Sequence, residues 1–251
     1  MKTVLRSVDM AFCMFSVIPM PVVAWEKKNM KYMLCSLPLV GLVIGVLVYF
    51  WTMLAGRLGL TDLLTAAVCA ALPAAVSGGV HLDGYADTVD AVSSHASPER
   101  KREILKDSHA GAFAIIWLCV YFLLYCACCG ELSDCRFWLL IPALSRTLGA
   151  FAGTAFPSSG KEGLLKTFRE GGSTKAAVIL VCWWIVLTAA AVFLLPAAAV
   201  FMAAAGVLVL LYVRKMSVKE FGGMSGDLAG FTISVSELFL LFAAVLAEKL
   251  Y

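Results

Sequence analysis

Charged residues are scarce in this chain of 251 residues. Asp, Glu, Lys and Arg make up 15% of it, whereas hydrophobic residues make up 61% and the mean hydropathy is +0.90. A soluble domain is usually about half apolar and about a quarter charged, so an ordinary soluble fold is excluded and helices buried in lipid are indicated. The net charge of +3 is also too small and too dispersed to indicate a nucleic-acid-binding protein.

Several other features are absent from the sequence. No polar stretch is long enough for a second domain and no internal repeat is visible, so we expect a single membrane-embedded domain over 1–251. No small-residue cleavage pattern follows the first apolar segment, so we do not expect a cleaved signal peptide. The nine cysteines form no paired framework, and most lie inside apolar runs, where cysteine behaves as a small hydrophobic residue.

Long apolar runs are abundant and predict an all-α, polytopic membrane bundle. A spanning helix needs about 20 apolar residues. Seven segments meet this requirement: 32–56, 60–80, 112–129, 137–156, 176–195, 197–213 and 228–247. Only Pro196 separates the fifth from the sixth, and the sequence leaves open whether they form a hairpin or one broken helix. Segment 3–18 carries Arg6 and Asp9, so we expect an interfacial or partly inserted helix there.

The distribution of Lys and Arg predicts the orientation of these spans. Cytoplasmic loops carry the excess of positive charge. From the N-terminus to the C-terminus, the segments between spans hold five, one, four, one, four, zero, three and one of these residues. This alternation places the N-terminus in the cytoplasm and the C-terminus outside. The polar, glycine-rich segments 81–111, 157–175 and 214–227 therefore face the cytoplasm, where we expect the active site.

An acidic cluster follows the second predicted span. Asp83, Asp87 and Asp90 are spaced so that their carboxylates share one face of a helix. Three like charges on one stripe repel each other, which indicates that a cation lies among them. Ligands made only of oxygen favour Mg²⁺, or Mn²⁺ as a substitute, over zinc. A solvated acidic face is the alternative, but six of the 17 acids and all three histidines fall in this one loop.

Other polar residues are expected near this cluster. His81 is a candidate general base or metal ligand, or a helix-end residue with a satisfied hydrogen bond. The run 222–227 is a glycine-rich loop whose backbone N–H groups could cradle phosphate, although glycines also permit tight turns. Arg146 and Glu237 lie inside predicted spans, where ionisable residues are functional candidates. The alternative for these two is a structural pair that holds two helices together.

Three motifs carry a resemblance to a known family. The run GVHLDGYADTVD at 79–90 is similar to the signature of the cobalamin synthase family, adenosylcobinamide-GDP ribazoletransferase. The runs KDSHAGAF at 106–113 and GGMSGD at 222–227 match its second and third motifs. The resemblance implies a Mg²⁺-dependent enzyme of the cytoplasmic membrane of a bacterium or archaeon. It would transfer the adenosylcobinamide phosphate group from adenosylcobinamide-GDP to α-ribazole, or its 5′-phosphate, and release GMP in a late step of vitamin B12 biosynthesis.

The resemblance and the acid chemistry together assign candidate roles. The candidate metal ligands are Asp83, Asp87, Asp90, Asp107 and Asp227. The candidate catalytic residues are His81, Asp83, Asp87 and Arg146, and Arg146 is expected to contact phosphate. The candidate phosphate-binding residues are Ser108, Gly222, Gly223, Ser225 and Gly226. The competing functions are a CDP-alcohol-type membrane phosphotransferase, a prenyl-diphosphate transferase and a cation transporter, whose acids should lie nearer the middle of the membrane. The oligomeric state is left open.

Overall fold

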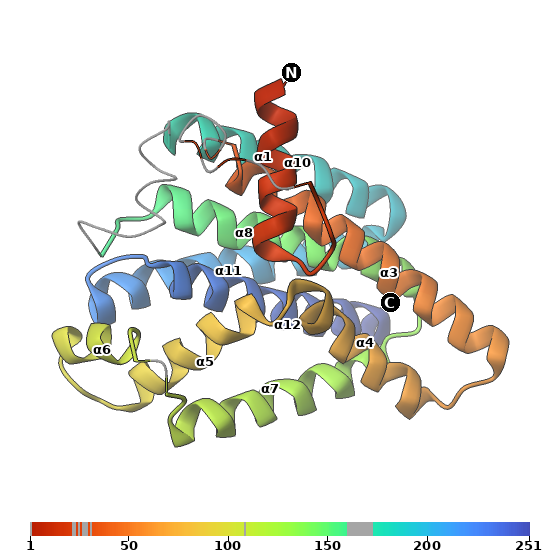
Figure 1. Ribbon diagram of the computed structural model, residues 1–251. Coiled ribbons are helices and arrows are strands. Elements are labelled where there is room, and N and C mark those ends of the chain that lie inside the picture. The colour runs from red at the N-terminus through yellow and green to blue at the C-terminus, as the bar shows by residue number, and fades with distance from the viewer. Residues whose placement is uncertain are drawn as a thin grey trace.

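A computed structural model shows an all-helical chain and describes residues 2–21, 24, 26, 30, 32–107, 109–159 and 173–251 (Figure 1). The α-helices in these residues are α1 (Lys2–Phe15), α3 (Leu37–Leu58), α4 (Asp62–Ser77), α5 (Val80–Ser93), α6 (Pro98–Ile104), α7 (Ala112–Glu131), α8 (Ile141–Ala155), α10 (Ser173–Leu194), α11 (Pro196–Phe221) and α12 (Gly226–Leu250). Two short 3₁₀ helices, η1 (Leu34–Ser36) and η2 (Cys135–Leu139), precede α3 and α8.

The boundary between α4 and α5 is a sharp bend. At the start of α4 the Thr61 side chain accepts a hydrogen bond from the Leu64 N–H, so the helix is capped. At its end Gly78 and Gly79 have φ values of 63° and 76°, in the left-handed region that favours glycine. The axis of α5 then makes an angle of 97° with that of α4. The acidic helix therefore turns away from the preceding helix instead of continuing it.

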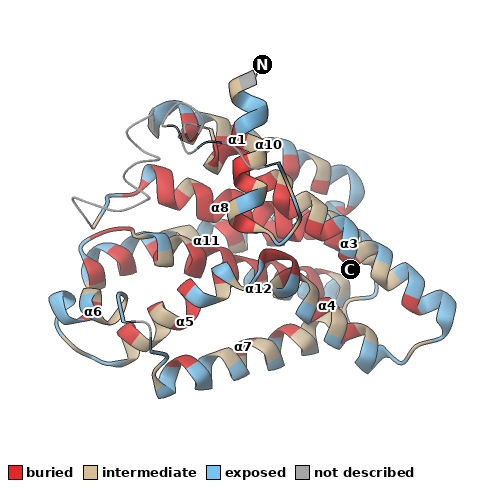
Figure 2. Cartoon of the chain, in the orientation of Figure 1, coloured by how far each residue is buried: buried red, intermediate tan, exposed pale blue. Residues whose placement is uncertain are grey.

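The chain is a polytopic membrane bundle, with five helices long and apolar enough to span a membrane in the described residues. They are the η1–α3 unit, α7, α10, α11 and α12, and the bent pair α4 and α5 makes a sixth if it counts as one span. Seven spans were expected. The difference arises largely at 137–156, which is divided between η2 and the 15-residue α8. Nearly all of α8 is buried by other helices (Figure 2), so its apolar sequence reflects the protein core.

The two segments on either side of Leu195 form a hairpin. Gly206 of α11 packs directly against the Trp184 indole of α10, and there is no room for a side chain at this glycine. The two residues lie at similar distances before and after the turn, so the helices run antiparallel. Pro196 is the first residue of α11, a position where its missing N–H costs nothing. The question that the sequence left open is thus answered in favour of a hairpin.

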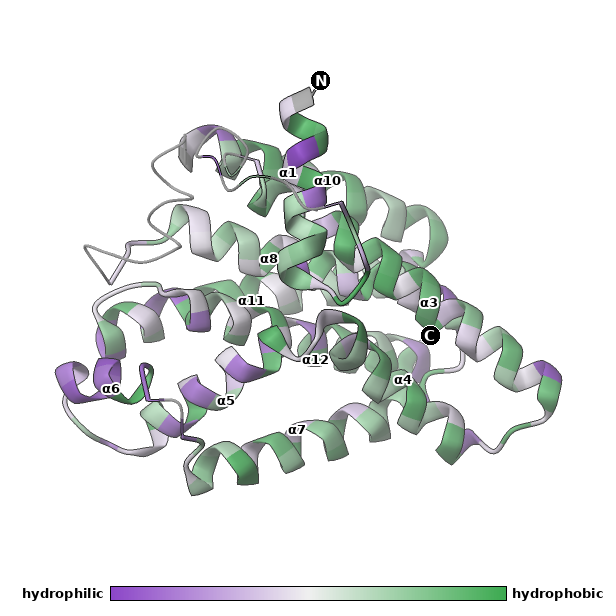
Figure 3. Cartoon of the chain, viewed as in Figure 1, coloured by the Kyte–Doolittle hydropathy of each residue, from purple (hydrophilic) through white to green (hydrophobic). Residues whose placement is uncertain are grey.

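α12 lies at the centre of the bundle and packs against α5, α8 and α11. The hydrophilic residues gather on α5 and α6, whereas α7 and α10 are mostly hydrophobic (Figure 3). Helix α1 covers most of segment 3–18, which was expected to be an interfacial or partly inserted helix. Its C-terminal end reaches the bend between α4 and α5. There the Phe15 ring stacks on His81 at a centroid distance of 5.8 Å, and the Val17 N–H donates to the Val76 carbonyl at 2.9 Å. α1 therefore supports the start of the acidic helix.

Candidate functional site

The acidic stripe lies on α5, as the spacing of its residues predicts. Asp83, Asp87 and Asp90 all fall within this helix, with Asp83 exposed and the other two half-buried. Tyr85 and Ala91 point elsewhere and are buried. One face of α5 thus presents three carboxylates while the rest of the helix is anchored by packing.

A close contact between α5 and α12 brings a fourth carboxylate to this stripe. A Cβ added to Gly84 would lie 2.6 Å from the Asp227 carbonyl oxygen, so only glycine permits the approach. As a result Asp87 experiences the negative charges of Asp83, Asp227 and Asp90. The structure therefore places Asp227 beside the α5 acids, while its role as a metal ligand stays a prediction.

These four acids have no positive partner in the part of the chain that the structure describes, because no described Lys or Arg forms an ion pair with them. Oxygen-only donors with uncompensated negative charge fit a hard divalent cation by their chemistry. Among the described residues, however, no three His, Cys, Asp or Glu side chains converge closely enough to hold one ion as they stand. Side-chain rotation of the carboxylates would be needed to close a coordination shell.

Asp90 also has a structural contact. Its Oδ1 accepts a hydrogen bond of 3.4 Å from the Ala114 N–H, in the first turn of α7. Its carboxylate also lies against Gly111, where an added Cβ would overlap with both oxygens. Negative charge at a helix N-terminus is favourable. Asp90 therefore helps to hold α7 against α5, whatever else it binds.

The second motif is not brought into the acidic stripe. Asp107 lies on an exposed loop, and its Oδ1 accepts hydrogen bonds from the His109 backbone N–H at 3.0 Å and from Nδ1 of the same residue at 2.8 Å. These bonds lower the pKa of the Asp107 carboxyl. Asp107 is not among the charges that act on Asp87. Ser108, the candidate phosphate ligand in this motif, lies outside the described residues.

Arg146 lies in the protein interior, where it pairs with Glu237. Its side chain is 2% exposed, and its guanidinium donates to the Glu237 carboxylate and to the Ser145 hydroxyl. The other carboxylate oxygen accepts a hydrogen bond of 2.8 Å from the Tyr125 hydroxyl, a partner that no sequence pattern revealed. This arrangement favours the alternative of a structural pair between α8 and α12. The predicted contact of Arg146 with phosphate stays a prediction.

His81 lies beside this buried pair. It is 5% exposed, lines a small cavity of about 20 Å³ together with Arg146 and Glu237, and its Nε2 has no hydrogen-bond partner among the described residues. Its backbone carbonyl accepts a hydrogen bond of 3.2 Å from the Ser234 hydroxyl. His81 is therefore separated from the solvent that reaches Asp83. Its roles as general base or metal ligand stay predictions.

Several N–H groups of the glycine-rich loop form hydrogen bonds within the fold, as expected of glycines that permit a tight turn. The N–H groups of Gly222 and Gly223 close the end of α11 on the carbonyls of Val218 and Ser217. The Met224 N–H donates to the Pro157 carbonyl, 2.7 Å away. Three N–H groups of the loop are thus occupied by hydrogen bonds within the protein. This pairing could not be read from the glycines, because its partners come from another segment.

The first turn of α12 keeps one free donor. Ser225 caps the helix, with its hydroxyl accepting from the Leu228 N–H at 3.2 Å. The Asp227 N–H donates to its own carboxylate, whereas the Gly226 N–H has no partner among the described residues. A helix N-terminus favours anions. Of the predicted phosphate-binding loop, Ser225 and Gly226 are therefore the better placed, while Gly222 and Gly223 shape the turn.

Known proteins are similar to nearly the whole chain. Residues 7–245 match the family described as cobalamin-5-phosphate synthase. Proteins named adenosylcobinamide-GDP ribazoletransferase are similar over nearly their full length. The one from Lachnoclostridium phytofermentans is 38% identical over 97% of this chain and 95% of its own. That from Clostridium botulinum strain Alaska E43 is 31% identical over 98% and 99%, and that from Clostridium perfringens strain SM101 is 31% identical over 94% and 96%.

No solved structure matches the chain significantly. The family resemblance inferred from the motifs at 79–90, 106–113 and 222–227 is confirmed by a match that covers all three. None of these relatives carries the name of a CDP-alcohol phosphotransferase, a prenyl transferase or a transporter. With its membrane helices and its acidic stripe on α5, the chain belongs to the cobalamin-5-phosphate synthase family, a family of transferases in cobalamin biosynthesis.

Proposed function

We propose that this chain transfers the adenosylcobinamide phosphate group from adenosylcobinamide-GDP to a hydroxyl of α-ribazole, or of its 5′-phosphate. The products are adenosylcobalamin, or its 5′-phosphate, and GMP. The names of the relatives support this reaction. The main structural support for this reaction is the position of Asp227 of α12 beside Asp83 and Asp87 of α5. Two of the three family motifs meet at this point.

The reaction breaks a diphosphate, and such transfers depend mainly on positioning and charge neutralisation. A new P–O bond forms to the ribose hydroxyl, the P–O bond to GMP breaks, and the hydroxyl proton must be accepted. We propose that Asp83, Asp87 and Asp227 hold Mg²⁺, for which Mn²⁺ could substitute, with Asp90 as a further ligand. Asp107, the other candidate from the sequence, lies apart from these acids and is left out of this proposed ligand set. When bound, the cation would neutralise charge on the diphosphate.

Two further assignments concern protons and phosphate. A carboxylate oxygen of the stripe that does not contact the cation accepts the hydroxyl proton. The second oxygen of Asp83 suits this role better than the buried His81 because the Asp83 side chain is exposed. The free N–H group of Gly226 and the Ser225 hydroxyl, at the start of α12, are proposed to contact phosphate. No contact with phosphate is required of Arg146.

The proposed setting is the cytoplasmic membrane, with the N-terminus inside and the α5 stripe on the cytoplasmic side. The charge alternation of the loops supports this orientation when 137–156, which holds η2 and the enclosed α8, also crosses the membrane.

Turnover of the purified full chain in lipid nanodiscs tests the proposal. Adenosylcobinamide-GDP is supplied with α-ribazole or with its 5′-phosphate, with Mg²⁺, with Mn²⁺ or with excess chelator. We expect equal amounts of GMP and of the cobalamin product, and no product with chelator. A matched control is Asp62→Asn, an acid of α4 that lies outside all three motifs. Release of CMP from a CDP-alcohol, with no GMP from the corrinoid substrate, would overturn the proposal.

A further inference from the structure

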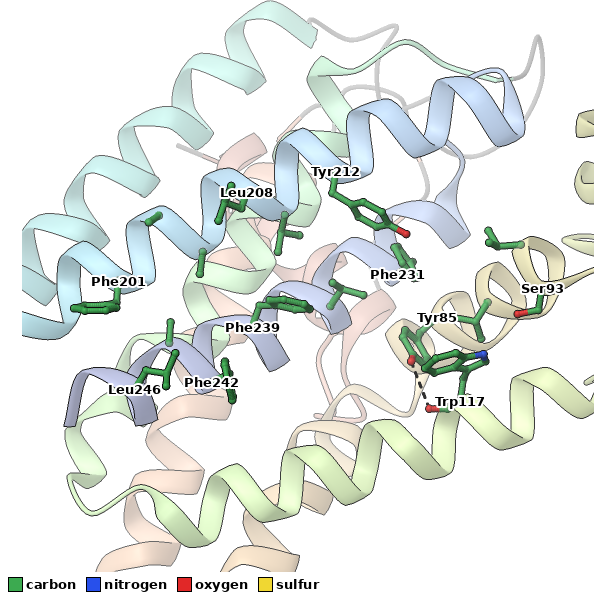
Figure 4. Close-up of a pocket in the computed structure, with 17 residues that line it drawn as sticks. Tyr85, Ser93, Trp117, Phe201, Leu208, Tyr212, Phe231, Phe239, Phe242 and Leu246 are labelled. Atoms are coloured by element: carbon green, nitrogen blue, oxygen red, sulfur yellow. Dashed lines mark hydrogen bonds between the residues drawn. The ribbon is translucent and has the colours of Figure 1, made fainter. Parts of the chain in front are cut away.

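A long apolar groove lies on the side of the bundle and takes no part in the proposed reaction. It has a volume of about 790 Å³ and runs between α11, α12, α5 and α7 (Figure 4). Its lining is almost wholly apolar, and several of its large side chains are open to the surroundings: Leu208, Tyr212, Phe239 and Phe242 are each more than half exposed. Such a surface is costly in water, so a hydrophobic occupant is expected.

The groove is separate from the acidic stripe. Tyr85 and Val89, which line it, lie on the face of α5 opposite to Asp83 and Asp87. Tyr85 also stacks on Phe231 of α12, with ring centroids 5.8 Å apart and an interplanar angle of 8°. This contact closes the space between the two helices, so the groove and the acids are on opposite sides of it.

The polar end of the groove is basic. Ala205, Leu208, Tyr212, Lys215 and Lys219 of α11 are three or four residues apart and share one face of the helix. The first three line the groove, and the two lysines continue the same stripe beyond its end. Both lysines are exposed.

One acid lies close to these lysines. Lys219 pairs with Glu220 at 3.1 Å, and the same carboxylate pairs with Lys101 of α6 at 2.5 Å. Lys215 has no ion pair with any residue that the structure describes. Three lysines and one glutamate leave about two positive charges at this end of the groove.

The length of the groove matches one leaflet of a bilayer. From Phe201 to Tyr212 the groove follows about three turns of α11, which correspond to roughly 16 Å. Half of a hydrocarbon core of about 30 Å is nearly the same depth. An acyl chain of one leaflet extends over the same depth.

We propose that the groove binds an acyl chain of an anionic phospholipid, whose phosphate head group lies on Lys215 and Lys219. The apolar walls contact the acyl chain, and the two exposed lysines bind the negatively charged head group. Basic residues at the cytoplasmic ends of membrane helices favour anionic lipids in this way. The occupant is thus a resident lipid, distinct from the substrates of the reaction.

Native mass spectrometry of the full chain tests the proposal, after release from nanodiscs of equal phosphatidylglycerol and phosphatidylcholine. We expect phosphatidylglycerol to be retained preferentially. Replacing both lysines, Lys215→Gln with Lys219→Gln, should weaken its retention on the order of tenfold. Ala204→Trp, which fills the groove from an exposed position, should reduce the retention of both lipids. The matched controls are Arg214→Gln and Val207→Trp, exposed residues of α11 that do not line the groove.

Two results would overturn the proposal. One is a lack of specificity, seen either as equal retention of the two lipids by the unchanged chain or as equal losses of lipid in the groove variants and their controls. Either result would mean that the lipid is ordinary boundary lipid. The other is a dimer that Ala204→Trp dissociates, which would assign the groove to a second copy of the chain. The readout is lipid retention and not turnover, so a failure of the proposed reaction would leave this result standing.

Discussion

Replacing Arg146 by Gln should destabilise the bundle strongly. The change leaves the Glu237 carboxylate, which is 2% exposed, with two neutral hydroxyl donors and no opposite charge. These are Tyr125 at 2.8 Å and Ser145 at 3.0 Å. Removing one partner of a buried ion pair costs about 3–5 kcal/mol. Because both oxygens of Glu237 keep a donor, we expect the lower end, about 3 kcal/mol.

The double variant separates a structural role from a catalytic one. Arg146→Gln with Glu237→Gln removes both charges, and replacing a whole buried pair is often nearly neutral. We therefore expect it to recover most of the lost stability. Because the guanidinium contacts Glu237 and not the solvent, we also expect turnover to recover. The control is Arg136→Gln, at the exposed pair with Asp134, which should change stability far less.

Thermal unfolding in nanodiscs and turnover are measured for the two single variants, the double variant and the control. At roughly 2–4 °C per kcal/mol for a chain of this size, Arg146→Gln should lower Tm by roughly 6–12 °C. A single variant that unfolds within about 2 °C of the unchanged chain would refute the reasoning about burial. A double variant that is stable but inactive would restore the predicted contact of Arg146 with phosphate.

Three other outcomes are expected. Asp83→Asn and Asp87→Asn should each lower turnover by at least about a hundredfold, the scale of losing one preorganised electrostatic contact, and near-normal turnover in both well-inserted variants would remove these acids from the site. Gly84→Ala should reduce turnover and Tm because a methyl group collides with the α12 backbone, whereas Gly56→Ala, with open space around it, should change neither. A cysteine at Ser158 should react only from the cytoplasm and a C-terminal tag only from outside; labelling from the same side would contradict the charge argument.

Part of the site could be predicted because local spacing determines it. Asp83, Asp87 and Asp90 share a face on any helix, so the stripe follows from their positions alone. The membrane character likewise follows from length and hydropathy, and Pro196 marks a break, although the choice between a hairpin and a broken helix needed the structure. These features need no knowledge of which helices are neighbours.

The remaining features depend on contacts between distant segments. The apolar run at 137–156 does not reveal that α8 is short and enclosed by protein, because core and lipid select the same residues. The glycines at 222 and 223 do not reveal that their N–H groups close α11. The sequence allowed two interpretations of Arg146 and Glu237, a structural ion pair or functional residues. Only the positions of α8 and α12 favour the ion pair.

The contact between α5 and α12 also bears on how the protein matures during synthesis. Ser234 of α12 bonds to His81 of α5, a residue made 153 positions earlier. The ribosome therefore delivers the acids of α5 long before the helix that completes their surroundings. Until α12 is inserted, α5 lacks the partner that packs against Gly84. Nascent chains that stall before this point carry Asp83, Asp87 and Asp90 without Asp227, so competence for catalysis is acquired only after α12 has been inserted.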